Sequence, residues 1–562
     1  MLGPNGPCAP FHPMHNIHSL RRPPVRRFSA RVSARVFLTI THFFKGKGAT
    51  NENHLIDAGV FGPMPIGKAL AVHCNLNCTC VLAMPSHAQV SYVDYSLNGS
   101  QKYVLRVAPA GMPAGTGTGQ PFLLNAIQVR LDKVRYWSTY LWSWTDCQAL
   151  VNLAAADGFN TVSIPVNWYE IETSEGTFNW TILDNYMSYA KAANIKMEII
   201  WTGTNSDGTV EWLGDSVNPV HLRTPDYVLY SPSYGSTATT SNYTIDTKFN
   251  PYTLVDTNIA LLAREEYVVG QMMTHIASWD SSNSYSHTVV GIQIENEMNG
   301  GDYNSAADVI GYINGIAAAV KSSNYSVWTR ANEQDSMSLV TSLVDYNESL
   351  GSSSHLDFIG RDDYSNSVTN IQAAMPLIGK NFQEIMENSG ENPFEIRLAA
   401  LAGNTGLGTY DMCGPDAGEG LYDQTANNSG TCTAYSNIDG DVISNLLMLD
   451  QDPVDLATLA QGSGLFVHNW NDAGVATTGG TLGITYTPTS TNDEAISIDR
   501  SSTQIVLMNA KGGTFTFPSS ITITSAQKGY FNSSNVWVDQ GSVSYSSHSI
   551  TPAPFTTVLL TY

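Results

Sequence analysis

Two glutamates that close apolar stretches are the residues of this sequence best suited to acid–base chemistry. Glu297 ends the stretch Val290-Gly-Ile-Gln-Ile-Glu-Asn-Glu, and Glu387 ends Phe382-Gln-Glu-Ile-Met-Glu. A carboxyl that is held protonated can donate to a leaving-group oxygen, while an ionised carboxylate about 5 Å away can act as the nucleophile of retaining glycoside hydrolysis. The alternative for both residues is a solvated loop acid without a chemical role.

The nucleophile has rivals at Glu384, Glu391 and Glu395. Period-two alternation predicts that Glu384 and Glu387 face opposite sides of one strand, so that only one of them points into the barrel mouth, and we prefer the position at the strand end. Glu391 and Glu395 follow a Ser-Gly break and flank a proline, which favours a loop or the start of a helix.

The same alternation predicts that Glu295 and Glu297 lie on one side of their strand, with Asn296 on the other side until the strand ends. An amide beside a proton donor can bond a sugar hydroxyl. The segment therefore predicts a carbohydrate site at the end of a strand.

The elements that must position these residues alternate between short β-branched or aromatic runs and helical patterns. Strands are expected at 122–129, 160–166, 195–201, 289–295, 325–331, 356–361, 382–386 and 464–469, and helices at 145–157, 181–193, 256–278, 306–322 and 368–375. This alternation predicts an α/β fold, a (β/α)8 TIM barrel over 121–478, whose chemistry lies at the carboxyl ends of the strands. Short strands between Gly, Ser and Pro turns predict an all-β, sandwich-like domain over 479–562.

Residues 1–88 differ from the rest because they are basic and rich in proline, and we interpret them as a non-domain leader. A secretory signal that begins at the internal Met64 and ends near Ala88 is the preferred interpretation. An organelle transit peptide over 20–44 and a misread gene start are the alternatives. Asn-x-Ser/Thr sequons, such as the one at Asn179, favour a secreted glycoprotein. Residues 89–120 are expected to add a strand and a Gly-rich linker.

Composition excludes several classes of function. The chain of 562 residues has a formal net charge of −22, which would repel a phosphate backbone and argues against nucleic-acid binding. No apolar run of about 18 residues occurs, so we expect no membrane span. After residue 88 no Cys or His cluster has zinc-site spacing, and we expect neither a metal nor a cofactor. Cys413 and Cys432 suit a disulfide or two buried thiols. The sequence does not specify an oligomeric state.

Two motifs resemble the family 35 and family 42 β-galactosidases of clan A. The first matches their strand-two signature, and it consists of Asn160-Thr-Val-Ser-Ile-Pro-Val-Asn-Trp168 followed by Glu172, Gly176, Phe178 and Trp180. The second, Ile292-Gln-Ile-Glu-Asn-Glu297, is similar to their Val-Gln-Val-Glu-Asn-Glu. The segment 504–538, with its Gly-Tyr-Phe and Val-Trp-Val, resembles the small β-rich C-terminal domain of enzymes related to family 35.

The resemblance implies roles for individual residues. Glu297 matches the acid/base, Asn296 the residue that bonds the sugar 2-hydroxyl, and Glu387 the nucleophile by position. Tyr364 matches a tyrosine that contacts the nucleophile, and Trp470 matches an aromatic platform under the sugar. Barrel-mouth packing is the alternative for both aromatic residues.

Substrate-binding candidates also come from the first motif and from the end of strand three. Trp168 belongs to the strand-two signature. Trp201 and Asn205 lie in Trp-Thr-Gly-Thr-Asn-Ser-Asp-Gly, which lacks the Arg-Pro-Gly-Pro-Tyr run of typical family 35 members. With Asp207, Glu211 and Trp212 they would line a sugar pocket, or they form an ordinary exposed loop.

We therefore expect an extracellular, metal-independent retaining β-glycosidase that is β-galactosidase-like and acts on oligo- or polysaccharides. An endo-acting β-glycanase of the same clan and a non-catalytic carbohydrate-binding barrel are the alternatives. A binding barrel should have lost one of the two glutamates, and a structural cell-wall protein would need neither.

Overall fold

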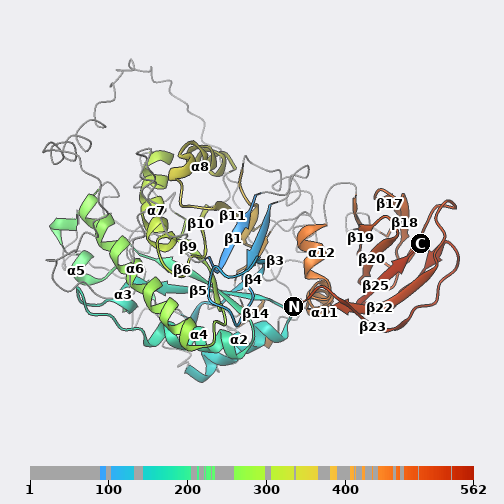
Figure 1. The fold of residues 1–562 in the computed structure, drawn as a ribbon, viewed down its shortest axis with the longest axis horizontal. Coiled ribbons are helices and arrows are strands. Elements are labelled where there is room, and N and C mark those ends of the chain that lie inside the picture. Colours follow the sequence, from blue (N-terminus) through green and yellow to red (C-terminus); the bar gives the residue numbers. More distant parts are fainter. Residues whose placement is uncertain are drawn as a thin grey trace, which may run out of the picture. The chain divides into compact units, whose positions relative to one another are not determined.

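A parallel β-barrel forms the centre of the fold (Figure 1). The computed structural model describes residues 89–95, 103–131, 144–203, 212–213, 220–221, 223–229, 231–234, 258–297, 305–333, 337–364, 380–388, 406–410, 412, 421–423, 433–434, 441–459, 464–468, 474–491, 493–532 and 534–562. The predicted leader 1–88 and the helix expected at 368–375 lie outside these residues.

Eight parallel strands close the barrel in the order β10-β11-β12-β13-β4-β5-β6-β9. They are β4 (Asn125–Gln128), β5 (Thr161–Asn167), β6 (Lys196–Thr202), β9 (Val289–Ile294), β10 (Trp328–Glu333), β11 (Phe358–Asp362), β12 (Glu384–Glu387) and β13 (Gly406–Thr409). The expected (β/α)8 barrel with a C-terminal β region is thereby confirmed.

Helices cover the outside of the barrel, so its strands are buried on both faces. All seven residues of β5 are buried, as are all six of β9. The covering helices are α2 (Trp144–Ala156), α4 (Thr181–Ala192), α6 (Ile259–Ser282), α7 (Ala306–Lys321) and α8 (Met337–Ser349). Asn258 begins α6 by accepting from the backbone N–H groups of Ala260 and Leu261, which satisfies donors that the first turn leaves unpaired.

A small antiparallel sheet closes the amino-terminal end of the barrel. It consists of β1 (Ser91–Asp94), β2 (Val104–Val107) and β3 (Gln120–Phe122). Val93 and Leu105 pack against Trp328 and Phe358, which lie at the first positions of β10 and β11. The residues expected to form one strand and a linker therefore form a three-stranded sheet that covers this end of the barrel. A catalytic site would lie at the opposite, carboxyl end of the strands.

The eighth barrel strand is β13 and not the predicted strand at 464–469. The predicted segment does form a strand, β16 (Leu465–His468), but it pairs antiparallel with β19 (Ala495–Ser501) in a C-terminal sheet. The sequence of β13 is Gly-Leu-Gly-Thr, which is short and lacks the β-branched run of its neighbours. Gly408 is required there because a Cβ would lie 1.9 Å from the carbonyl oxygen of Met386.

Two antiparallel sheets form the C-terminal β region. The six-stranded sheet has the order β16-β19-β20-β25-β22-β23, and the four-stranded sheet has the order β17-β18-β21-β24. The strands after β16 are β17 (Thr477–Gly479), β18 (Ile484–Thr487), β19 (Ala495–Ser501), β20 (Gln504–Asn509), β21 (Thr514–Thr516), β22 (Ser525–Phe531), β23 (Trp537–Ser542), β24 (Ser549–Ile550) and β25 (Thr556–Thr561). Side chains from both sheets share one apolar core that includes Tyr486, Leu507 and Phe515.

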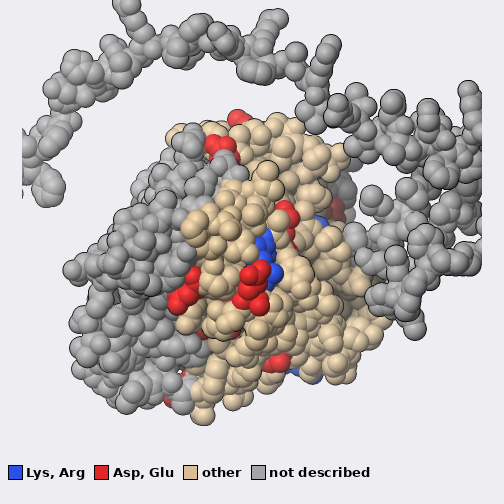
Figure 2. Space-filling model, turned by 90° about the vertical axis from the view of Figure 1, so that its left-hand side faces the viewer, with Lys and Arg blue, Asp and Glu red and all other residues tan. Residues whose placement is uncertain are grey.

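Short elements complete the described chain. They are α3 (Trp168–Ile171), β7 (Trp212–Leu213), β8 (Val220–His221), α5 (Asp226–Leu229), η1 (Pro232–Tyr234), η3 (Gly351–Ser353), β14 (Tyr422–Asp423), β15 (Thr433–Ala434), α11 (Asp441–Leu449) and α12 (Pro453–Thr458). None of the described helices combines the length and hydropathy that a bilayer crossing requires. Figure 2 shows that the described surface on one face is mostly uncharged, with acidic side chains in small groups.

Candidate active site

Polar side chains gather at the carboxyl ends of the barrel strands. Gln128 is the last residue of β4, Asp362 the last of β11 and Glu387 the last of β12. Asn332 is the last but one residue of β10, and Glu297 follows the end of β9. Because these ends meet at one edge of the barrel, residues far apart in sequence form one cluster.

The structure brings Glu297 and Glu387 together. One carboxylate oxygen from each of them, and one from Asp362, lie within 4.8 Å of one another. Glu387 and Asp362 are buried, and Glu297 is half-buried. Three carboxyl groups at this spacing cannot all be ionised without strong mutual repulsion, so at least one of them is expected to hold a proton.

Two donors hold the carboxylate of Glu387. Gln128 Nε2 donates to Glu387 Oε1 at 2.9 Å, and the hydroxyl of Tyr364 donates to Oε2. The second bond is the contact that the resemblance implies for Tyr364. Desolvation of the Tyr364 hydroxyl, together with the nearby charge of Glu387, raises the pKa of this tyrosine, so the phenol stays neutral and donates.

The backbone around Glu297 adopts left-handed conformations. The φ angles of Glu295 and Glu297 are 61° and 45°, and non-glycine residues rarely adopt such values outside sites where the surroundings enforce them. The backbone N–H of Glu297 donates to Asn332 Oδ1 at 3.1 Å. Since β9 ends at Ile294, alternation does not apply to the residues that follow.

Glu295 and Glu297 do not lie on one side, contrary to the prediction. Glu297 lies with Asp362 and Glu387, whereas Glu295 Oε2 accepts from the backbone N–H of Gly203 at 3.0 Å. The left-handed turn between these two glutamates sends their side chains apart. Glu295 is fully buried and is therefore unsuited to touch a substrate.

The side chain of Asn296 is oriented by two donors. Its Oδ1 accepts from Gln293 Nε2 at 2.9 Å and from Asn332 Nδ2 at 3.1 Å. Both bonds occupy the carbonyl oxygen of the amide, so the NH2 group is the part that can donate to another molecule. This orientation suits the role in binding a sugar hydroxyl that the resemblance implies for Asn296.

A buried carboxyl pair anchors the loop that carries Glu297. Glu265 on α6 is fully buried, accepts from Trp201 Nε1 at 2.8 Å, and also accepts from the hydroxyl of Tyr312 on α7. Burial and the neighbouring Glu295 raise the pKa of Glu265 well above its usual value. The protonated Glu265, which lies beside Glu295 and accepts from Trp201 and Tyr312, therefore links the end of β9 to two outer helices.

This pair predicts a pH dependence of stability. The folded chain binds the Glu265 proton more tightly than the unfolded chain, so the free energy of unfolding should fall as pH rises above the ordinary glutamate range. Glu265→Gln cannot ionise, so its free energy of unfolding should fall less steeply than that of wild type between about pH 5 and pH 8, where Glu333 and Glu384 still contribute to the decline. Urea unfolding across this range measures the effect, with Glu175→Gln, at an exposed position, as the control. Parallel curves of unfolding free energy against pH for wild type and Glu265→Gln would contradict the raised pKa of Glu265.

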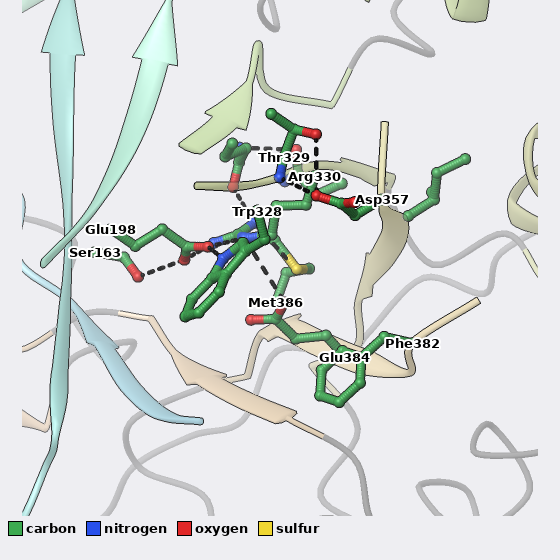
Figure 3. Close-up of polar contacts among 12 residues, drawn as sticks. Ser163, Glu198, Trp328, Thr329, Arg330, Asp357, Phe382, Glu384 and Met386 are labelled. Carbon is green, nitrogen blue, oxygen red and sulfur yellow. Dashed lines mark hydrogen bonds and ion pairs between the residues drawn. The ribbon is translucent and has the colours of Figure 1, made fainter. Parts of the chain in front are cut away.

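The rival Glu384 lies inside the barrel with Arg330 (Figure 3). Arg330 Nε donates to Glu198 Oε1 at 2.6 Å and lies 3.7 Å from Glu384 Oε2. These contacts cross from β10 to β6 and to β12, which are not its neighbours in the barrel, so they run through the interior. Trp328 Nε1 also donates to Glu198 Oε1, at 2.9 Å. Burial raises the pKa of Glu384 to about 8.

Regular alternation between Glu384 and Glu387 is interrupted in the structure, contrary to the prediction. The register between β11 and β12 shifts from Arg361 opposite Ile385 to Asp362 opposite Glu387, which leaves one extra residue on β12. Such an irregularity re-aims the side chains that follow it. Glu384 therefore lies deeper in the barrel beside Arg330, and Glu387 reaches the mouth.

The predicted tryptophans do not offer faces to a sugar. Trp168 and Trp201 are fully buried, and their indole N–H groups donate to Glu172 and Glu265. A ring with no exposed face cannot stack on a substrate, so the substrate-binding roles expected for Trp168 and Trp201 are wrong. Trp470 and Asn205 lie outside the described residues, as do Asp207, Glu211, Cys413 and Cys432, and the side chain of Trp212 is not described.

Cation binding is a second possible use of the three carboxyl groups at the mouth. Among the described residues, Glu297, Asp362 and Glu387 form the one group of His, Cys, Asp and Glu side chains with suitable spacing. Asp362 is 1% exposed, and burial beside Glu387 and Glu297 raises its pKa well above the usual range. A proton and a cation would compete for these three carboxyl groups, because either one offsets their mutual repulsion.

Sequence reasoning missed the partners of the two glutamates. Gln128 and Asp362 are the last residues of β4 and β11, and Asn332 is the last but one residue of β10. Gln128 directly follows apolar residues, so the signal that singled out Glu297 could have found it. Arginines interrupt the runs before Asn332 and Asp362, which hides these two residues from the same signal. A different signal marks Arg330 and Glu198, because each is a charged residue inside a predicted buried strand. Burying a charge without a partner is costly, so each of them indicates a buried partner of opposite charge.

Comparisons with known proteins give likenesses of fold only. Neither a family model nor a curated protein matches the chain. Solved structures that resemble it include endo-glycoceramidase II from Rhodococcus sp. as a lactosyl-enzyme intermediate, with 11% identity, 79% of this chain and 98% of that chain covered and a TM-score of 0.40. A GH30 endoxylanase from Clostridium papyrosolvens C71 has 10% identity, covers 84% and 98%, and has a TM-score of 0.42. The endo-1,4-beta-mannanase from Rhizomucor miehei has 13% identity, covers 60% and 97%, and has a TM-score of 0.40.

Proposed function

We propose that this protein is a retaining β-glycosidase with Glu297 as the acid/base and Glu387 as the nucleophile. The observation that carries the proposal is the closeness of the two carboxyl groups, since one oxygen of Glu297 lies within 4.8 Å of one oxygen of Glu387. Retaining glycosidases need about 5 Å, whereas inverting enzymes need about 6.5–9.5 Å to admit a water molecule between the two carboxyl groups. The spacing therefore favours direct attack by one carboxylate.

The surroundings of the two glutamates support different protonation states. Glu387 accepts bonds from Gln128 and Tyr364, and donors to a carboxylate favour its ionised form. Glu297 lies beside Asp362 and Glu387, and like charges favour the protonated form of a carboxyl. One ionised and one protonated carboxyl are what double displacement requires.

The reaction follows from these two states. Glu387 attacks the anomeric carbon, the glycosidic C–O bond breaks, and Glu297 gives its proton to the departing oxygen. The Glu297 carboxylate then takes a proton from water, the water oxygen attacks the anomeric carbon, and Glu387 leaves as a carboxylate. Both steps invert the anomeric centre, so the product keeps the β configuration.

For the substrate we propose β-galactosides. The support is the resemblance of Ile292-Gln-Ile-Glu-Asn-Glu297 and of the segment 160–168 to the family 35 and family 42 signatures. The Asn296 NH2 group, which can donate to the sugar 2-hydroxyl, fits any of several pyranoses. The motifs therefore support the choice of galactose as the sugar, and the carboxyl pair supports the retaining reaction.

A panel of aryl β-glycosides, with the product followed by NMR, tests both parts. We expect aryl β-galactosides to be hydrolysed faster than the matched glucosides, mannosides and xylosides, and the β-anomer to appear before mutarotation. A faster rate on another sugar, or on internal bonds of a polysaccharide, would change the substrate class and leave the mechanism intact. An α-anomer as first product would contradict retention.

A further inference from the structure

Asp362 is a third carboxyl in the site to which double displacement gives no role. It ends β11, it is 1% exposed, and one of its oxygens lies within 4.8 Å of an oxygen of Glu297 and of Glu387. Its Oδ2 accepts from Asn332 Nδ2 at 2.9 Å. Its Oδ1 is buried and has no hydrogen-bond donor among the described residues. A buried acidic oxygen without a donor is costly when ionised and suits a carboxyl that carries a proton.

The groups around the pair Asp362 and Glu297 are mostly acidic or neutral. They are Arg330 and Glu333 on β10, Glu387 on β12, and Asp363 and Tyr364 after β11. Arg330 is occupied by Glu198, and Asp363 is paired with Arg361 at 2.7 Å. Burial, together with the nearby charge of Glu297, raises the pKa of Glu333 to about 8. These surroundings disfavour two negative charges on Asp362 and Glu297.

Asn332 holds the pair in place. Its Nδ2 donates to Asp362, and its Oδ1 accepts from the backbone N–H of Glu297. One amide therefore bonds the backbone of Glu297 and the carboxyl group of Asp362, and it ties the two residues together. Burial beside Glu387 and Glu297 also raises the pKa of Asp362, so the pair retains a proton at a pH where isolated carboxyls are ionised.

We propose that Asp362 and Glu297 share one proton in the free enzyme, so that Asp362 acts as a positioning residue that keeps the acid/base protonated. The inference rests on the proposed function. The negative charge that the pair carries raises the affinity of Glu297 for the shared proton. When Glu297 gives that proton to the leaving oxygen, Asp362 and Glu297 are both left ionised, which favours the uptake of a proton from the attacking water in the second step.

Asp362→Asn tests the shared proton. Asparagine keeps an oxygen that can accept from Asn332, but it removes the charge beside Glu297. The alkaline limb of the pH profile of kcat/KM should therefore move to lower pH, by about one unit or more. Asp363→Asn is the matched control, because it removes the neighbouring acid that is paired with Arg361. The alkaline limb of its kcat/KM profile should lie at the same pH as in wild type. Asp362→Glu, which restores an ionisable group, should return the limb toward wild type.

A titration without substrate separates this inference from the proposed function. Carbon-13 NMR of protein labelled at the glutamate side-chain carboxyl carbon reports the ionisation of Glu297, and Glu297→Gln identifies its resonance. The resonance should titrate at lower pH in Asp362→Asn than in wild type. If the resonance moves in this way but the protein hydrolyses no glycoside, the shared proton is supported and the proposed function is refuted. If the enzyme is active but neither the resonance nor the limb moves, the role of Asp362 is refuted.

Discussion

Glu387→Gly is expected to abolish turnover while leaving the fold intact. The substitution removes the carboxylate that Gln128 and Tyr364 hold at the end of β12, and no covalent intermediate can then form. Loss of a nucleophile lowers kcat by roughly 10⁴-fold or more, and the residual rate comes from substrate binding and the other groups of the site. Steady-state kinetics on the best aryl glycoside measure the loss. Circular dichroism and the unfolding midpoint verify the fold.

Azide provides the positive control for Glu387→Gly. A small anion can enter the space left by the carboxylate and attack the anomeric carbon from the same side, so azide should restore aglycone release and give an α-glycosyl azide. Gln383→Gly places a glycine directly before the same strand, away from the carboxyl cluster, and should keep most of the activity. Rescue in Glu384→Gly in place of Glu387→Gly would transfer the nucleophile to the rival residue.

Glu297→Gln should slow hydrolysis of natural glycosides by about 10²–10⁴-fold. An amide has no proton of suitable acidity for a departing sugar oxygen, and it cannot act as a base toward water. When the aglycone is an acidic phenol, it departs as a phenolate without protonation. The first step on such aryl glycosides should therefore be slowed less by the substitution. A series of aryl glycosides with different leaving groups measures the difference. The hydrolysis rate of the variant should depend on leaving-group pKa more steeply than the rate of wild type. Equal rates of variant and wild type on natural glycosides would remove Glu297 from the mechanism.

The position of most barrel strands could be predicted because buried parallel strands read as apolar runs. The runs at 160–166, 195–201 and 289–295 coincide with β5, β6 and β9 to within one or two residues. β13 could not be predicted in this way, since two of its four residues are glycines, and one of them, Gly408, lies too close to the backbone of Met386 in β12 to carry a Cβ. The run at 464–469 correctly predicts the strand β16, but an apolar run does not specify which sheet a strand joins.

The two glutamates could be predicted because each follows an apolar run at the end of a strand. Their environment depends on barrel closure, which local patterns do not contain. Gln128 and Glu387, which bond each other, are 259 residues apart. The tryptophan predictions failed for a related reason, because a large aromatic residue near a strand end packs into the core as readily as it faces a ligand. The left-handed turn at Glu295 and Glu297 gave no signal in the sequence.

Covalent labelling tests the central claim most directly. A 2-deoxy-2-fluoro β-glycoside with a good leaving group slows both steps of a retaining reaction but lets the intermediate accumulate, so the sugar remains attached to the nucleophile. Peptide mass spectrometry then locates the label. We predict one 2-fluoroglycosyl group per chain, on Glu387, and none on Glu387→Gly. A label on Glu384, Glu391 or Glu395, or turnover of the wild type without any covalent intermediate, would contradict this assignment.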